Sequence, residues 1–200
     1  MARYLPSFLL GFHGCDREVA ERVFAGEDDL RPSENEYDWL GHGVYFWEGN
    51  PTRGLEYAEL LKGSKRRGSA SRIKEPAVVG AVIDPGQCLN LLDSAYLRLI
   101  ADAYDQLKAA AEVDGLELPK NKRIGDSRDL LLRDLDCAVI EVAHRIRVRD
   151  ELGEFDTVRG VFIEGPPLYP DAGFHQQNHI QICVRNPACI VGYFRPREGL

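Results

Sequence analysis

Apolar runs of strand length lie in the first and last parts of this chain, and the long stretches with helical periodicity lie between them. The runs are bounded by turn-forming residues and are found at 7–13, 43–47, 76–83, 158–163, 179–184 and 190–194. Apolar residues recur at helical spacing in 17–25, 52–61 and 93–111. This order predicts an α+β fold with mostly antiparallel sheets and flanking helices, rather than a repeating strand–helix–strand unit.

Three further segments carry weaker structural signals. The stretch 127–135 predicts a second helix in the middle of the chain, with an Asp or Ser at its start as the cap. The run 137–144 suits either a strand or a continued helix. The segment 63–72 is basic, small and glycine-rich, and it predicts a mobile loop because it has little apolar surface to bury. Asp16 could cap the helix that follows it.

Length and charge limit the classes of protein that fit. A chain of 200 residues with 44% hydrophobic and 28% charged side chains suits one domain spanning residues 1–200. The formal net charge of -7 argues against a surface built wholly for nucleic acid, although the basic segment 62–74 could contact phosphates locally. No run approaches the roughly 18 apolar residues of a membrane span. A cytoplasmic location without a membrane partner is therefore the default expectation.

The five cysteines do not form a pattern of ligands or disulfides. Their number is odd, and none forms a C-x-x-C pair or a cluster with histidines at metal-ligand spacing, so no metal site is expected. Each lies beside or within an apolar run, which predicts small buried hydrophobic side chains in a reducing compartment. They are Cys15, Cys88, Cys137, Cys183 and Cys189.

The segment 39–47 is the most informative stretch when no family is considered. Gly41 and Gly43 lie two residues apart, and the aromatic group 45–47 follows directly. Glycines let the backbone approach a ligand closely, and aromatic rings offer a flat surface for stacking. The combination predicts a site for a flat ring. The alternative is that the aromatic residues are core and the glycines form a bulge.

The order of motifs in the first part of the chain carries a family resemblance. An apolar strand ends in His13-Gly14, a helix and a loop follow, then Gly41-His42-Gly43-Val44-Tyr45-Phe46, and then a helix containing Tyr57-Ala58. This order resembles the catalytic domain of the poly(ADP-ribose) polymerase-like branch of the ADP-ribosyltransferases. The resemblance is good over about the first sixty residues and partial at the end of the chain. It implies an ADP-ribosyltransferase-like fold, in which split sheets and flanking helices surround a cleft for NAD+.

The resemblance also implies roles for single residues in binding NAD+ as a substrate. His13 would bind the adenosine-side ribose, and backbone groups of Gly14 would hold the nicotinamide amide. The rings of Tyr45 and Tyr57 would cover the two faces of the nicotinamide. Such a clamp fixes the geometry in which nicotinamide leaves and an oxocarbenium-like sugar forms. The implied NAD+-binding residues are His13, Gly14, Gly43, Tyr45, Phe46 and Tyr57.

A third element of the family pattern, a glutamate at the start of a late strand, has no direct counterpart here. The matching strand is 179–184, and it begins with His179 and carries Gln181 instead. These two side chains alternate with isoleucines, so both should project from one face of the strand. His179 could bond a ribose or act as a base, and Gln181 could bond a ribose hydroxyl. Glu164, which ends the preceding apolar run, could supply the missing carboxylate.

The leading hypothesis is a mono-ADP-ribosyltransferase that modifies a macromolecule, either a protein or a nucleic acid, because polymer formation in the resembling family relies on the glutamate. By analogy, such a chain fits a bacterial toxin or defence effector with an antitoxin or inhibitor protein as partner. One alternative is an inactive module that only binds NAD+ or ADP-ribose. Another is an RNA-directed enzyme, either a 2'-phosphotransferase of related fold or a ribonuclease using His13, His179 and the basic loop.

Overall fold

The computed structural model describes residues 7–63, 73–123 and 129–197. Over these ranges the chain is a mixed α+β fold with four α-helices and a mostly antiparallel sheet. In chain order the elements are β1 (Leu9–Asp16), α1 (Arg17–Phe24), β2 (Val44–Glu48), α2 (Pro51–Gly63), β3 (Pro76–Ile83), β4 (Cys88–Asn90), α3 (Ser94–Asp114), β5 (Asn121–Arg123), β6 (Leu130–Arg133), α4 (Asp134–Arg149), β7 (Thr157–Phe162), β8 (His179–Val184), the short 3-10 helix η1 (Pro187–Cys189) and β9 (Ile190–Phe194).

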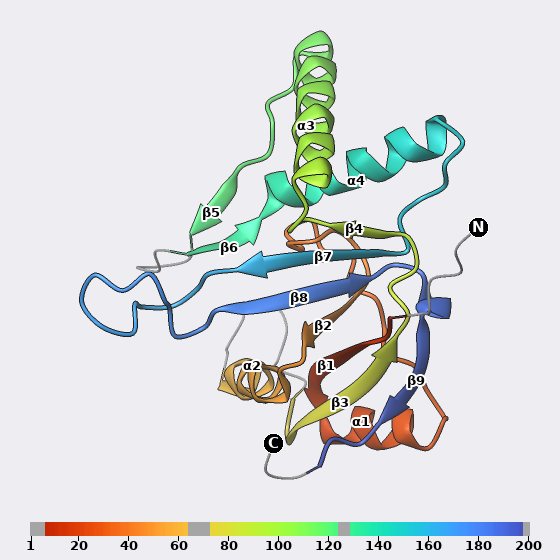
Figure 1. Ribbon diagram of the computed structural model, residues 1–200, viewed down its shortest axis with the longest axis vertical. Coiled ribbons are helices and arrows are strands. Elements are labelled where there is room, and N and C mark those ends of the chain that lie inside the picture. Colours follow the sequence, from red (N-terminus) through yellow and green to blue (C-terminus); the bar gives the residue numbers. More distant parts are fainter. Residues whose placement is uncertain (1–6, 64–72, 124–128, 198–200) are drawn as a thin grey trace.

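The main sheet has seven strands in the order β4-β7-β8-β2-β1-β3-β9 (Figure 1). Every neighbouring pair is antiparallel except β4 and β7, which run parallel. Strands β5 and β6 form a separate antiparallel hairpin. The sheet therefore joins the first strands of the sequence to the last ones, because β2 pairs with β8 and β3 pairs with β9.

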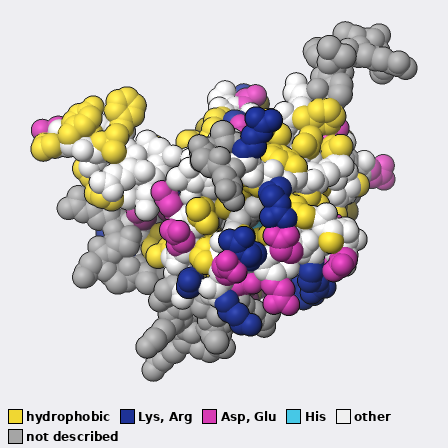
Figure 2. Space-filling model, turned by 90° about the horizontal axis from the view of Figure 1, so that it is seen from below, with side chains coloured by type: hydrophobic (Ala, Val, Ile, Leu, Met, Phe, Trp, Pro, Cys, Tyr) yellow, Lys and Arg dark blue, Asp and Glu magenta, His cyan; other side chains and the backbone are white. Residues whose placement is uncertain are grey.

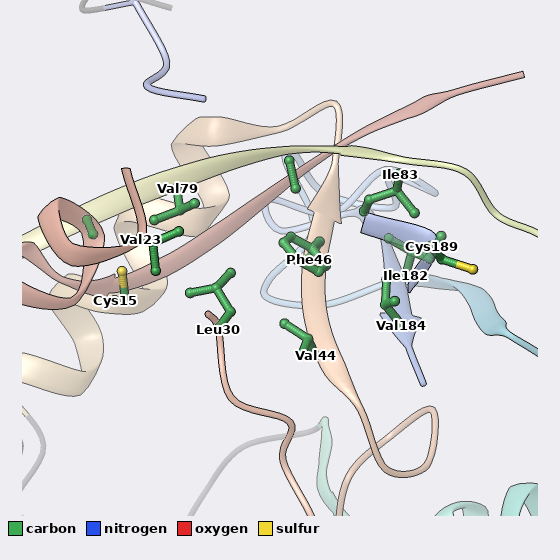
Figure 3. Close-up of a cluster of buried hydrophobic side chains, with 12 residues drawn as sticks. Cys15, Val23, Leu30, Val44, Phe46, Val79, Ile83, Ile182, Val184 and Cys189 are labelled. Atoms are coloured by element: carbon green, nitrogen blue, oxygen red, sulfur yellow. The ribbon is translucent and has the colours of Figure 1, made fainter. Parts of the chain in front are cut away.

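Successive side chains of each strand project from opposite faces of the sheet, and the two faces pack against different helices. On one face, Phe46, Val79 and Ile182 pack with Val23 of α1, and these side chains belong to the apolar cluster drawn in Figure 3. We call it the α1 face. Complete burial of each such side chain contributes about 1.5–3 kcal/mol, so the cluster holds α1 against the sheet.

The opposite face, which we call the α2 face, is covered by two helices. Trp47 lies on it and contacts Tyr57 of α2. Trp47 pairs with Gln181 of β8. Cys183 lies two residues after Gln181, so it projects from the same face, where it packs with Ile140 of α4. Helix α3 packs in turn on α4, and both lie toward the β4 and β7 side of the sheet in Figure 1. Helix α2 covers β1 and β3.

The predicted cap at the start of α1 is confirmed. The Asp16 side chain accepts a hydrogen bond from the Glu18 backbone N–H at 3.0 Å, and its other carboxylate oxygen accepts from the Glu75 backbone N–H at 3.1 Å. A single carboxylate therefore satisfies an unpaired N–H of the helix end and ties the start of β3 to the end of β1.

The helix predicted over 127–135 is wrong. Residues Leu130–Arg133 form strand β6, which pairs with Asn121–Arg123, and α4 begins only at Asp134. Leucine favours helix only by a few tenths of a kcal/mol, so pairing with a neighbouring strand decides the local structure. The ambiguous run 137–144 lies within α4. Most of the predicted loop 63–72 falls outside the described residues.

The cysteines are all unpaired. Four of them are buried, as predicted for small core side chains, and Cys88 is only half-buried. Cys15 and Cys189 lie in the cluster of the α1 face, and Cys183 lies in the apolar cluster under α4. Within the described ranges, none of the helices is both long enough and apolar enough to cross a membrane.

Candidate functional site

A cluster of aromatic and charged side chains lies on the α2 face where β2, β7 and β8 meet α2. Trp47 pairs with Gln181 across β2 and β8, and Phe162 pairs with His179 across β7 and β8. Cross-strand partners share a face, so these four side chains project from the same side of the sheet. The group we call the central cluster consists of Trp47, Arg53, Tyr57, Phe162, Glu164 and His179.

Ring contacts connect the strands of the central cluster to α2. The ring centroids of Trp47 and Tyr57 are 4.9 Å apart. His179 lies over Phe162 with ring centroids 5.5 Å apart and an interplanar angle of 28°, and its centroid is 6.5 Å from that of Trp47. The rings form one continuous aromatic surface that runs from the helix to the end of β7.

Glu164 joins this surface because the pairing of β7 with β8 continues past the strand ends. The Gln177 backbone N–H donates to the Glu164 carbonyl oxygen at 3.0 Å. Glu164 lies two residues beyond Phe162, so it projects to the same face. Its Oε2 atom is 3.7 Å from His179 Nδ1 and 3.9 Å from Arg53 Nη2. The structure therefore brings together the candidates Glu164, His179 and Tyr57, with Gln181 on the same face.

The Glu164 carboxyl group is buried, with only 6% of the residue exposed. Burial raises its pKa to about 7, although the charge of Arg53 opposes the shift, and the charge of Asp129 adds to it. A carboxyl group with such a pKa is partly ionised and partly protonated near neutral pH. Titratable groups shifted in this way by burial and a specific charged partner are frequent at functional sites.

The protonation of His179 follows from its hydrogen bond. Its Nδ1 atom lies 2.7 Å from the Gln177 carbonyl oxygen, which can only accept, so Nδ1 carries the hydrogen. Burial lowers the pKa of His179, and the charges of Arg53 and Arg133 lower it further. The hydrogen bond to Gln177 acts in the opposite direction. The ring is therefore neutral at pH 7, and its Nε2 atom carries a lone pair.

Three buried nitrogen atoms of the central cluster have no hydrogen-bond partner among the described residues. They are Trp47 Nε1, Arg53 Nε and His179 Nε2. Buried polar groups in proteins nearly always have a partner, and leaving one unsatisfied costs about 1–3 kcal/mol. His144 Nε2 and Arg185 Nε, outside the cluster, are unpartnered as well. Three of the five such atoms among the described residues thus belong to the central cluster, which favours a ligand-binding site here.

Tyr45 has a structural task in addition to any contact with a ligand. Its hydroxyl accepts a hydrogen bond from the Leu40 backbone N–H and donates one to the Gly41 carbonyl oxygen, both at 2.7 Å. Burial raises the pKa of the Tyr45 hydroxyl well above its usual value. The ring packs in the apolar cluster that includes Cys183. Tyr45 thus fixes the glycine-containing turn in front of β2.

We expect Tyr45→Phe to destabilise the fold by about 1–3 kcal/mol, because the Leu40 N–H loses the Tyr45 hydroxyl and the Gly41 carbonyl keeps only the weaker bond from Cys183 Sγ at 3.6 Å. Urea unfolding of the two proteins measures the difference. Tyr169→Phe is the control, since the Tyr169 side chain is exposed on the loop between β7 and β8. Equal stability of Tyr45→Phe and the unchanged protein would contradict this role.

The two glycines of the segment 39–47 bring the backbone against other parts of the fold. A Cβ atom on Gly43 would lie 2.6 Å from Cys183 Sγ, and one on Gly41 would lie 2.6 Å from Glu141 Oε1. Gly41 also has a φ of 77°, which favours glycine. Packing against β8 and α4 therefore accounts for both glycines.

The structure separates His13 from the central cluster. His13 Nδ1 donates to the Tyr45 carbonyl oxygen at 2.8 Å, and its ring centroid lies 5.9 Å from that of Phe46. Both side chains lie on the α1 face, because Phe12 is the residue that pairs with Trp47. His13 therefore joins β1 to β2 on the side of the sheet opposite His179, and the binding roles of His13 and Phe46 stay predictions.

Arg53 and Phe162 were not predicted from the sequence, and Trp47 was predicted only as part of the aromatic group 45–47. Trp47 lies two residues after Tyr45, so the alternation of a strand places it on the same face as that residue. Arg53 lies four residues before Tyr57 in α2, one helical turn away. Phe162 carries no sequence signal of its own, because its proximity to His179 depends on the pairing of β7 with β8.

An apolar cavity of about 530 Å³ lies next to the central cluster. It is lined by Phe162 and Trp39 together with Ile100 of α3 and Val139 of α4. The Arg133 guanidinium lies 4.4 Å from the Trp39 ring centroid and 5.0 Å from that of Phe162. Phe162 is thus a wall shared by the cavity and the cluster.

Comparison with known proteins gives a distant relative without a known activity. No family model and no solved structure matches the chain. An uncharacterized protein of the archaeon Methanocaldococcus jannaschii is 24% identical over 198 aligned positions, which cover 90% of this chain and 83% of that protein. This similarity extends over nearly the whole fold, and it assigns no function.

Proposed function

We propose that this chain is an NAD+-dependent ADP-ribosyltransferase that transfers a single ADP-ribose to a macromolecule. The observation that carries the proposal is the convergence of Glu164 with His179 and Tyr57 on one face of the sheet. The late strand lacks the glutamate of the resembling family, and Glu164 supplies a carboxylate next to the first residue of that strand. A buried carboxylate, a neutral imidazole and a stacking surface are the groups that this reaction needs.

The residues of the central cluster fit NAD+ as a substrate. Tyr57 is half-buried and offers aromatic surface for the nicotinamide ring, and the buried Trp47 supports it from behind. The unpartnered Trp47 Nε1 and Arg53 Nε atoms can only donate, and the carboxamide and ribose groups of NAD+ present oxygen acceptors. The NAD+ site would then lie on the α2 face, next to the apolar cavity that Phe162 lines.

Glu164 stabilises positive charge in the proposed reaction. As the bond between ribose C1' and nicotinamide breaks, nicotinamide leaves with the electron pair and the sugar becomes oxocarbenium-like. The ionised Glu164 carboxylate lies in a buried site, where a charge acts more strongly than in water. Tyr57, packed on Trp47, holds the ring in the orientation from which it leaves. His13 contributes by fixing the junction of β1 and β2.

Binding of NAD+ tests the stacking surface separately from catalysis. We expect Tyr57→Leu to weaken NAD+ binding about 10-fold, since loss of one base–aromatic stack costs about 1–3 kcal/mol. Isothermal titration calorimetry measures the dissociation constant, and Tyr57→Phe, which keeps the ring, should bind nearly as well as the unchanged protein. Leu60→Ala, an exposed change on the same helix, is the control. Equal affinity of a folded Tyr57→Leu protein would remove Tyr57 from the site.

A further inference from the structure

The neutral His179 ring limits which chemical group can approach it. Its Nδ1–H is committed to the Gln177 carbonyl oxygen, so the unpartnered Nε2 atom can accept a hydrogen bond but cannot donate one. A hydroxyl group donates to such an atom. An ionised carboxylate has no hydrogen to donate, so its lone pairs would repel the lone pair of Nε2. The Nε2 atom is closed to solvent, so an incoming group reaches it only after a neighbouring side chain shifts.

We propose that the acceptor is a side-chain hydroxyl group of a protein, and that His179 Nε2 removes its proton; this inference rests on the proposed ADP-ribosyl transfer. In the step, the acceptor oxygen forms a bond to ribose C1' and its proton passes to His179 Nε2. The bond between C1' and nicotinamide breaks, and nicotinamide takes the electron pair. Glu164 Oε2, 3.7 Å from Nδ1, then stabilises the imidazolium.

The charged groups around His179 come from several elements. Glu164 lies beyond the end of β7, Arg53 comes from α2, and Arg133 comes from β6; Asp129 acts on Glu164. Burial, and after it the two arginines, lowers the pKa of His179, which keeps the ring in its base form at neutral pH. A base that is mostly unprotonated at the working pH can take a proton in every catalytic cycle.

The surface next to the site favours a protein acceptor over a nucleic acid. The loop from Gly165 to Asn178 connects Glu164 to His179, and its tip exposes Leu168, Tyr169 and Phe174. Figure 2 shows hydrophobic side chains gathered on the projecting edge of the molecule, where Figure 1 places this loop. Exposed apolar side chains that lie together are typical of protein contacts. The net charge of -7 also disfavours a phosphate backbone.

The linkage formed on acceptors tests this inference. The full-length protein is incubated with a cell lysate and NAD+ labelled in its adenylate part, while nicotinamide release is followed in parallel. We expect label in protein that resists neutral hydroxylamine, since an O-glycosidic bond to a hydroxyl is stable there. His179→Gln should lower this transfer about 100-fold, the usual contribution of a general base, with an unchanged dissociation constant for NAD+.

A matched control separates this role from a structural one. His175 also places its Nδ1 atom 2.7 Å from a carbonyl oxygen, that of Gly165, but lies outside the central cluster. His175→Gln should therefore transfer ADP-ribose at the rate of the unchanged protein. If hydroxylamine or ribonuclease releases the label, or if water is the only acceptor, the hydroxyl inference is overturned while the proposed function stands. If neither the unchanged protein nor any variant releases nicotinamide, both the hydroxyl inference and the proposed function are overturned.

Discussion

Replacing Glu164 with glutamine is expected to lower the rate of nicotinamide release about 100- to 1,000-fold, the usual cost of removing one electrostatic contact to a transition state. The amide keeps the shape of the side chain but has no negative charge to offer the developing oxocarbenium ion. The dissociation constant for NAD+ should change little, because ground-state binding depends on the aromatic surface. Initial rates at saturating NAD+ measure the effect.

The pH dependence of the rate provides a second readout of Glu164. Only the ionised carboxylate stabilises positive charge, and burial raises its pKa to about 7. Activity should therefore rise from about pH 6 to about pH 8, and this rise should vanish in Glu164→Gln. Asp171→Asn, an exposed change in the adjacent loop, is the control. A Glu164→Gln protein with the original rate and pH profile would exclude Glu164 from catalysis.

Gly14→Ala is expected to destabilise the protein by about 3 kcal/mol, the upper part of the usual range for overpacking. A Cβ atom on Gly14 would lie 2.0 Å from the Gly54 carbonyl oxygen of α2. This neighbour is backbone, so α2 as a whole must move away from β1. Arg53 and Tyr57 would move with it, and NAD+ binding should weaken as well. Urea unfolding and calorimetry measure the two effects.

Gly192→Ala in β9 is the matched control for Gly14→Ala. A Cβ atom on Gly192 meets no heavy atom within 4 Å, so its stability should change by less than about 1 kcal/mol. If Gly14→Ala is as stable as the Gly192→Ala protein, the close packing of α2 on β1 is wrong. Loss of NAD+ binding without loss of stability would instead favour the direct backbone contact to nicotinamide that the family resemblance implies for Gly14.

The strands were largely predictable because most are short apolar runs between turn residues. The run 76–83 predicts β3 residue for residue, and 179–184 predicts β8. The strand Leu130–Arg133 was missed because three successive leucines suit a helix equally well. Only its pairing with Asn121–Arg123 makes it a strand, and such a tertiary contact leaves no periodicity in the sequence.

The sequence predicts those parts of the candidate site that depend only on the alternation of side chains along a single strand. His179 and Gln181 were expected on one face, and the register of β8 against β7 and β2 confirms it. The contact of Glu164 with His179 depends on the pairing of β7 with β8, which the sequence does not reveal. The register of β1 against β2 places His13 on the face opposite His179, and the sequence does not reveal this register either.

Release of nicotinamide is the most direct test of the proposed function. The full-length protein is incubated with NAD+ labelled in the nicotinamide ring, and free nicotinamide is separated and counted over time. We expect release that depends on the unchanged Glu164 and is lost in Glu164→Gln. NAD+ binding without any release would contradict the enzymatic proposal and would identify the chain as a nucleotide-binding module. Absence of both binding and release would contradict the assignment of the central cluster as an NAD+ site.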